Sequence, residues 1–296
     1  MRITTQMLYL QFNYNLQNSM NSIYQTDEQI ASGQKLNRPS DDPAAVSGII
    51  SGKAQLSSIA GYQDAITNAS QLLNATSTAL DSLNTLISNA KQAGTNATSG
   101  SASDMATYAS MIGNLIQSTI GIANTKVGDR YIFSGYATDK PAVDTTGTLQ
   151  GTSDLISMQI NTGTSVNVNV TAAGLIASGS YPDNTTIIGV MQSLQADIQG
   201  NQAGIQSDLA NLDKLSSNIL DKQSDVGARL NMMDSEKQIL TASDTDVTNN
   251  VSDKLMLSTV DLARLSAQSQ QQQTALSSLR TITNGVLNTS LFDFLK

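Results

Sequence analysis

The side chains that could do chemistry in this sequence are carboxylates, hydroxyls, amides and a few lysines and arginines. Cysteine and histidine are absent, which removes thiolate nucleophiles, the commonest general base and the usual ligands of structural zinc. The adjacent carboxylates of Asp41 and Asp42 could bind a hard cation, but a helix cap accounts for Asp42 without a metal. The sequence contains no HExxH motif, no glycine-rich phosphate loop and no nucleophile elbow. We therefore expect no catalytic residues, no metal and no cofactor, and we do not expect an enzyme.

The charge balance argues against a nucleic-acid partner. The 296 residues include 16 basic and 24 acidic side chains, which gives a net charge of -8, whereas neutralising phosphates requires a basic surface. Charged residues make up only 14% of the chain, against roughly 25% in an average globular protein. Ser, Thr, Asn and Gln provide most of the polar surface, and such side chains can be buried between subunits at a lower desolvation cost than ions.

No segment has the length of a membrane span. The longest apolar runs contain only a few residues, far short of the roughly 20 that a transmembrane helix needs. The N-terminal stretch from Met1 to Leu10 has no continuous hydrophobic segment and no small-residue cleavage site. It does not resemble a conventional signal peptide, so an exported chain would have to leave the cell by another route.

Few prolines interrupt the chain, and this favours long helices. The four prolines all precede residue 183, and an interior proline would break a helix. Asp42 can cap a helix whose first position is Pro43, because proline has no N–H to leave unpaired there. The sequence predicts helices over residues 5–32, 43–93, 104–125, 190–240 and 247–288, with a polar loop at 94–103.

An apolar repeat of 3.5 residues runs through three of these helices, over residues 59–87, 205–240 and 251–286. The amide run Gln270–Gln273 interrupts the last of them for one turn. A helix over residues 43–93 would be roughly 75 Å long and could not bury its stripe alone. We expect the helices after residue 190 to return beside it.

The periodicity changes between residues 128 and 189. Met158 and Ile160, and then Val166, Val168 and Val170, alternate with polar residues, as strands do. The residues Asn161-Thr162-Gly163 lie between these two runs and favour a turn. We therefore predict a β-hairpin within residues 155–171, in a small β-rich insert.

Together these patterns predict a mainly α fold. It is a long antiparallel helical bundle or coiled coil in which the N- and C-terminal helices pair, with a small inserted β-rich domain. We expect terminal assembly segments (1–40 with 285–296), a helical bundle domain (41–127 with 190–284) and the β-rich insert (128–189).

Both ends of the chain carry apolar side chains that a soluble monomer rarely leaves uncovered. One interpretation is that these ends pack on their own domain; the other is that they bury against neighbouring subunits. Under the second interpretation we expect an assembly interface made of Ile3, Met7, Leu10, Leu276, Leu279, Val286, Leu291, Phe292, Phe294 and Leu295.

Four stretches, in the right order along the chain, resemble the flagellin superfamily. The first reads QIASGQKLNRPSDDPAA over residues 29–45, and the second reads IANTKVGDRYIFSG over residues 122–135. The others are VGARLN at residues 226–231 and SLFDFL at residues 290–295. Flagellins typically read "SSGLRIN…KDDAAG" in the first block. The variant with Asn37-Arg38-Pro39 and Asp42-Pro43 is closer to the hook–filament junction family, hook-associated protein 3.

This resemblance implies a secreted structural adaptor that leaves the cell by flagellar type III export, without a cleaved signal. Members of the family lie between the first hook-associated protein and the flagellin filament, outside the cell. The implied partners are copies of the chain itself in a ring, the first hook-associated protein, flagellin and an export chaperone. From the residues we hypothesise helical polymerisation through terminal segments that cannot bury their apolar stripes alone. In the assembly the N- and C-terminal helices would pair as a coiled coil, and neighbouring copies would cover the remaining apolar face.

Two other functions remain open. A minor flagellin would use the same helical ends but form a filament by itself. An adhesive or host-recognition module would use the insert, residues 130–189, as its binding surface and the helices as a stalk. An enzyme is a third alternative, against which the absence of histidine argues.

Overall fold

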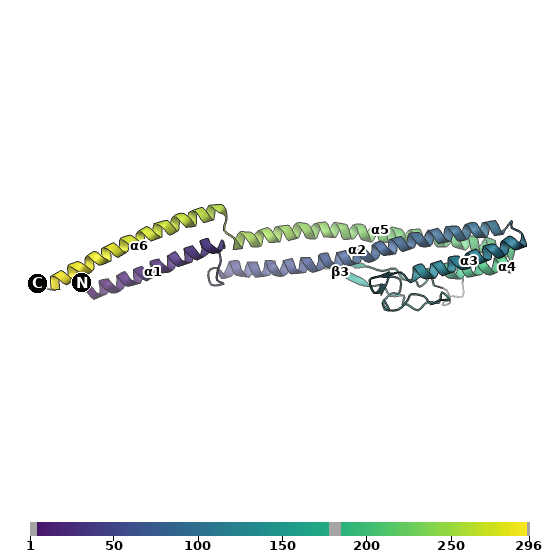
Figure 1. The fold of residues 1–296 in the computed structure, drawn as a ribbon, viewed down its shortest axis with the longest axis horizontal. Coiled ribbons are helices and arrows are strands. Elements are labelled where there is room, and N and C mark those ends of the chain that lie inside the picture. Colours follow the sequence, from purple (N-terminus) through teal and green to yellow (C-terminus); the bar gives the residue numbers. More distant parts are fainter. Residues whose placement is uncertain (1–4, 178–184, 295–296) are drawn as a thin grey trace. The chain divides into compact units, whose positions relative to one another are not determined.

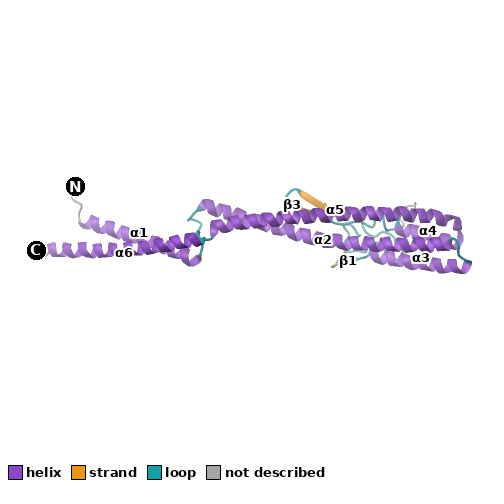
Figure 2. Ribbon diagram, turned by 90° about the horizontal axis from the view of Figure 1, so that it is seen from above, coloured by secondary structure: helices purple, strands orange, loops and turns teal. Residues whose placement is uncertain are grey.

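The computed structural model describes residues 5–177 and 185–294, and these residues form helices with two small sheets (Figures 1 and 2). The helices are α1 Thr5–Ser32, α2 Pro43–Ala97, α3 Ala102–Ala123, α4 Ile187–Gly200, α5 Gln202–Leu255 and α6 Thr259–Phe294. The strands are β1 Lys126–Val127, β2 Arg130–Tyr131, β3 Ser157–Asn161 and β4 Thr164–Asn167. The chain divides into two compact units, residues 1–58 with 243–296 and residues 59–242. The predicted mainly α fold with a small β-rich region is confirmed.

The first unit contains α1 and α6, which pair in antiparallel orientation. Thr26 and Asp27 near the end of α1 contact Gln272 and Ser269 near the middle of α6. The predicted pairing of the N- and C-terminal helices is therefore confirmed.

The start of α2 follows the sequence closely. The Oδ1 atom of Asp42 accepts hydrogen bonds from the backbone N–H groups of Ala44 and Ala45, each at 3.0 Å, and Pro43 is the first helical residue. This cap satisfies donors that have no partner inside the helix.

The second unit has its core between α2, α3, α4 and α5. The α2 side chains at the predicted heptad positions, Ile66, Leu73, Leu80, Leu83 and Ile87, are at most 1% exposed. They share one apolar cluster with buried side chains of α3, α4 and α5. The heptad stripe predicted along α2 therefore faces a core made by its own chain.

The β-rich insert is built from two antiparallel pairs, β1 with β2 and β3 with β4. The loop between β3 and β4 contains Thr162 and Gly163, and Gly163 has a φ of 80°, which glycine adopts without steric cost. The predicted hairpin is confirmed. Phe133 and Ile160 of the insert are fully buried in the same apolar cluster as the bundle helices, so insert and bundle pack against each other.

Three predicted boundaries were wrong. The helix α2 continues to Ala97 instead of ending at residue 93. Gly94 does not end the helix but leaves room for neighbouring side chains, because a Cβ there would lie only 3.0 Å from Leu209 and 3.2 Å from Leu194. The helix predicted over residues 190–240 is two helices that meet at Asn201. The next break lies at residues 256–258 instead of 241–246, where backbone groups form hydrogen bonds with residues 33 and 35, far away in the sequence.

None of the helices in residues 5–177 and 185–294 combines the length and the apolar character that crossing a bilayer demands.

Candidate assembly surface

The helix α1 turns one apolar face toward α6. Phe12, Leu16, Ile23, Thr26 and Ile30 recur at intervals of three, four or seven residues and are half-buried or buried. Ile23 and Thr26 are the most enclosed, at 9% and 5% exposed. We call this the inner face of α1. It corresponds to the narrow seam of a two-helix coiled coil.

The matching face of α6 mixes apolar and polar side chains. Leu265, Ser269, Gln272, Leu276 and Leu279 follow the same spacing and are half-buried or buried. Ser269 donates a 2.8 Å hydrogen bond to Asp27 Oδ1, and Thr26 lies 3.4 Å from Gln272 Oε1. The amide run that interrupts the apolar stripe therefore supplies a polar partner for α1 at this turn.

A second apolar face of α1 points away from α6. Met7, Leu10 and Tyr14 are 61%, 60% and 62% exposed. At 100° per residue they lie roughly 140–160° around the helix from Phe12. We call these three residues the outer face of α1. The helix is therefore apolar on two sides, and among the side chains that the structure describes only one of them meets another helix.

The outward face of α6 has a different chemistry. Thr274, Ser278 and Thr281 each donate their hydroxyl to the backbone carbonyl four residues earlier, at 2.9–3.0 Å. With their donors used inside the helix, these side chains present mainly methyl groups and short methylenes. These three positions of α6 are thus weakly polar, whereas Met7, Leu10 and Tyr14 on the outer face of α1 are large and exposed.

The chain segment that follows α1 forms hydrogen bonds with the segment that connects α5 to α6. Lys35 donates its backbone N–H to the Leu255 carbonyl at 2.7 Å, and Leu257 donates to the Gly33 carbonyl at 2.9 Å. Gly33 ends α1 with a φ of 67°, a common helix termination. These bonds explain why the helix breaks at residues 256–258, because the carbonyls and amides there pair across the chain. We call residues 33–35 with 255–257 the joint.

The side chain of Lys35 connects the joint to both flanking helices. Its ammonium donates to the Asp253 carbonyl of α5 at 3.0 Å and lies 3.2 Å from Asp261 Oδ2 in the first turn of α6. Hydrogen bonds from Ser258, and then from Lys35, lower the pKa of the Asp261 carboxyl. Because Lys35 is partly exposed, solvent screens its ion pair, which therefore contributes little to stability. The backbone bonds are the stronger element of the joint.

A polar cleft of about 560 Å³ lies beside the joint. Its lining includes Gln25 and Glu28 of α1, Asn37 and Arg38 of the loop before α2, and Gln268 of α6. Arg38 pairs with Glu28 at 3.3 Å, which holds the loop against α1. The lining is mainly amides and hydroxyls, and its two carboxylates are already bound: Glu28 pairs with Arg38, and Asp41 accepts the backbone N–H groups of Asn37 and Arg38.

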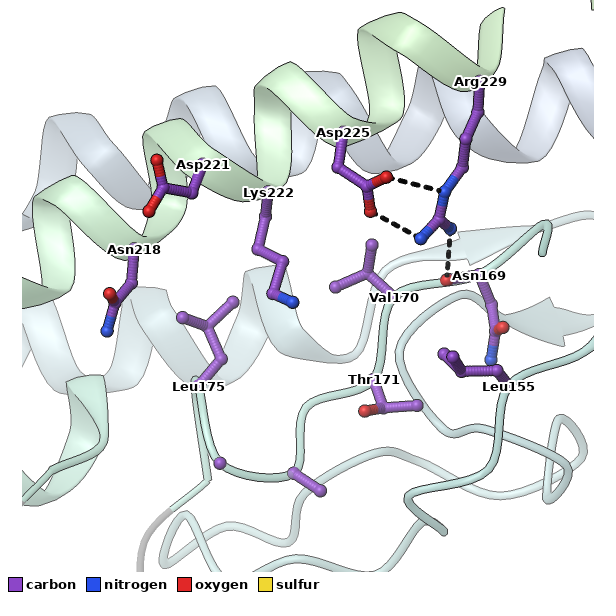
Figure 3. Close-up of a pocket in the computed structure, with 12 residues that line it drawn as sticks. Leu155, Asn169, Val170, Thr171, Leu175, Asn218, Asp221, Lys222, Asp225 and Arg229 are labelled. Carbon is purple, nitrogen blue, oxygen red and sulfur yellow. Dashed lines mark hydrogen bonds and ion pairs between the residues drawn. The ribbon is translucent and has the colours of Figure 1, made fainter. Parts of the chain in front are cut away.

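In the second unit, the side chain of Arg229 of α5 binds backbone carbonyl groups of the insert (Figure 3). Its Nη1 atom donates to the carbonyls of Asn167 and Asn169 at 2.9 and 3.2 Å, and its Nε atom donates to Asp225 at 3.2 Å. The neighbouring cavity, about 410 Å³, is bounded by α5 and the loop around Leu175. Arg229 therefore serves as a structural anchor.

The structure places the predicted interface residues in two groups. Met7 and Leu10 lie on the outer face of α1, whereas Leu276 and Leu279 lie on the α6 face toward α1. Ile3 and Leu295 lie outside the described residues, as do the side chains of Val286, Leu291, Phe292 and Phe294.

Sequence reasoning missed Tyr14 and the joint. Tyr14 follows Leu10 by four residues, a spacing that a search for a second apolar face would have found. The joint has one local signal, Ser258 with Asp261, which is the spacing of a capping box.

Comparison with known proteins identifies relatives of this chain. Residues 3–138 match the family described as the bacterial flagellin N-terminal helical region. Flagellar hook-associated protein 3 of Escherichia coli (strain K12) is 27% identical over 321 aligned positions, which cover 100% of both chains.

Two solved structures from Legionella pneumophila share the fold. Flagellar hook-associated protein-3 has a TM-score of 0.61 at 15% identity, covering 69% of this chain and 98% of that one. The flagellar junction protein FlgL has a TM-score of 0.56 at 16% identity, covering 71% of this chain and 100% of that one. The predicted resemblance to the flagellin superfamily is therefore confirmed, and the chain is similar along its whole length to flagellar hook-associated protein 3.

Proposed function

We propose that this chain is a structural subunit of the flagellar hook–filament junction and that it assembles through the outer face of α1. The observation that carries the proposal is that α1 has two apolar faces, the inner face and the outer face. Its inner face is used by α6, while Met7, Leu10 and Tyr14 remain at least 60% exposed. Burying an apolar side chain of this size is worth about 1.5–3 kcal/mol, so three of them can stabilise a contact between copies.

The narrowness of the α1–α6 seam supports the same proposal. Along the described side chains of the pair, Ile23 is the one apolar residue that is at least nine-tenths buried. Two helices joined by so little apolar area are only marginally stable in isolation. Contacts with neighbouring copies would add the missing burial, so folding of the ends would be completed by assembly. A head-to-tail contact of this kind continues around a ring or a helical tube.

The remaining predictions about location and partners belong to this proposal. The chain would leave the cell by flagellar type III export, with an export chaperone, and lie outside the cell as a ring. It would contact the first hook-associated protein on one side and flagellin on the other. Residues 1–40 with 285–296 would provide assembly, residues 41–127 with 190–284 the bundle, and residues 128–189 a spacer.

The proposal is tested by deleting the gene in the bacterium that encodes it and restoring either the normal gene or a Met7→Asp/Leu10→Asp variant. The deletion should leave hooks bare in electron micrographs while flagellin is shed into the medium. The normal gene should restore filaments and the variant should not, although both proteins are made and exported. Filaments of normal length in the deletion strain would contradict the junction role.

Purified protein distinguishes the two alternatives. A minor flagellin would grow long filaments unaided, and electron microscopy of the concentrated protein would reveal them. An adhesive module would bind glycans or host cells through the insert and would lose that binding when loop residues near Leu175 are changed. Neither result is expected of a junction subunit, which should form at most short rings or remain dispersed.

A further inference from the structure

The cavity between α5 and the insert has an apolar side and a polar side. Its volume is about 410 Å³, which lies in the range of pockets that bind small molecules. Val170 and Leu175 of the insert are 6% and 5% exposed, and they line the cavity together with Leu155. In such a pocket the apolar side chains hold the body of a ligand, and a few polar groups fix its orientation.

The α5 side of the cavity carries two acidic and two basic side chains, and these are not equally available to a ligand. They are Asp221, Lys222, Asp225 and Arg229. Arg229 is occupied, because its guanidinium binds Asp225 and two carbonyl groups of the insert. Lys222 forms neither an ion pair nor a hydrogen bond with any residue that the structure describes. Its ammonium group is therefore the available cation of this cavity.

Figure 3 shows where the two unpaired charged side chains of α5 point. Lys222 extends toward the insert loop that carries Thr171 and Leu175, whereas the carboxylate of Asp221 is turned away from that loop. The backbone N–H groups of Thr171 and Ala173, which also line the cavity, donate no hydrogen bond within the described part of the chain. A ligand that lies against this loop therefore meets one free positive charge and hydrogen-bond donors without partners.

We propose that this cavity binds a small monocarboxylic acid with an apolar chain. Lys222 binds the carboxylate, and Leu155, Val170 and Leu175 contact the apolar chain. A single negative charge suits the site better than a phosphate dianion, because there is one available cation and the protein has a net charge of -8. The inference is independent of the junction role, since every residue that lines the cavity lies within the second unit, residues 59–242.

The test is a titration of the isotope-labelled full chain with sodium hexanoate, followed by amide NMR, with sodium chloride as the reference salt. The amide signals of Thr171, Ala173 and Lys222 should shift and reach saturation. Hexan-1-ol has the same apolar chain without the charge, and sodium acetate has the charge without the chain. Each should bind at least about fivefold more weakly than hexanoate, because each lacks one of the two contacts.

Substitutions in the cavity separate the two contacts. Lys222→Gln should weaken hexanoate binding by about fivefold or more and leave the circular dichroism spectrum unchanged, because Lys222 is exposed. Lys214→Gln is the matched control, since Lys214 is an exposed lysine of the same helix that does not line the cavity; this variant should bind hexanoate normally. Leu155→Ser should weaken the binding of hexanoate but not that of acetate.

Three results would overturn the proposal. The first is a set of amide shifts that grow linearly with hexanoate and never saturate. The second is hexan-1-ol binding as tightly as hexanoate, which would leave Lys222 without a role. The third is an equal loss of hexanoate binding in Lys222→Gln and Lys214→Gln. The first two use only the normal protein, so they remain decisive if a variant fails to fold.

Discussion

Gly52 of α2 lies directly against Val251 of α5, so that a Cβ built on Gly52 would come within 2.4 Å of Val251 Cγ2. One turn earlier, a Cβ on Gly48 would lie 2.7 Å from Lys254 Nζ. The two glycines present a flat strip of backbone to α5, and the helices approach more closely there than larger residues would permit. The contact lies within the first unit, next to the joint.

Alanine at Gly52 should therefore destabilise this helix contact, although alanine is the better helix former. We expect Gly52→Ala to lower the free energy of unfolding by roughly 1–3 kcal/mol, as overpacking does. Gly61→Ala in the same helix meets nothing within 4 Å and should raise stability by up to about 1 kcal/mol. Urea unfolding followed by circular dichroism measures both. If both substitutions changed the free energy of unfolding equally, α2 and α5 could move apart at Gly52 without loss of stability, contrary to this prediction.

Serine in place of Tyr14 should weaken assembly without unfolding the monomer. Tyr14 is 62% exposed on the outer face of α1, so the isolated chain loses little. The contact between copies should lose roughly 1.5–3 kcal/mol, and filament formation should fail or become sensitive to temperature. Tyr136→Ser is the matched control, because Tyr136 is 63% exposed in the insert. Motility and incorporation into the flagellum should be normal for the control. If both substitutions reduced incorporation equally, the outer face of α1 would not be the assembly surface.

Local sequence signals predicted the fold well where a side chain acts on its own backbone. Asp42 and Pro43 fixed the start of α2, and the turn at Gly163 fixed the hairpin. The break at residues 256–258 was misplaced because its cause is remote in sequence. Gly33 and Lys35 satisfy the backbone groups of that segment, and no periodicity in residues 241–258 indicates it.

The candidate surface was predictable only in part for a different reason. A heptad search finds one stripe per helix, and in α1 the stripe that packs on α6 is Phe12, Leu16 and Ile23, whereas Met7 and Leu10 lie on the other side. Which of two apolar faces remains uncovered depends on the partner helix.

Aspartate in place of Leu279 should separate the terminal helices while leaving the bundle folded. Leu279 is half-buried on the α6 face toward α1, where a carboxylate would lose hydration without gaining a partner. Hydrogen exchange should accelerate in residues 5–32 and 259–282 but not in 59–242, and incorporation into the flagellum should be lost.

Ile282→Asp provides the control for that substitution, since Ile282 lies three residues further along α6 and is 55% exposed. Its exchange pattern should remain normal. Loss of protection throughout residues 59–242 in Leu279→Asp would show that the terminal helices and the bundle unfold together, contrary to the division into two units.

Glutamine in place of Arg229 should release the insert from α5. The guanidinium donates to two carbonyls of the insert and is fixed by Asp225, and its side chain is only 17% exposed. Hydrogen bonds from a charged group are worth about 1.5–3 kcal/mol, and glutamine cannot reach both carbonyls while also binding Asp225. Protease cleavage within residues 150–177 should therefore become faster in Arg229→Gln. Lys222→Gln removes a charge from an exposed side chain one turn before Asp225 and should leave cleavage unchanged. If both variants are cleaved at the normal rate, the insert is held by its apolar contacts with the bundle, and the hydrogen bonds of Arg229 do not contribute to holding it.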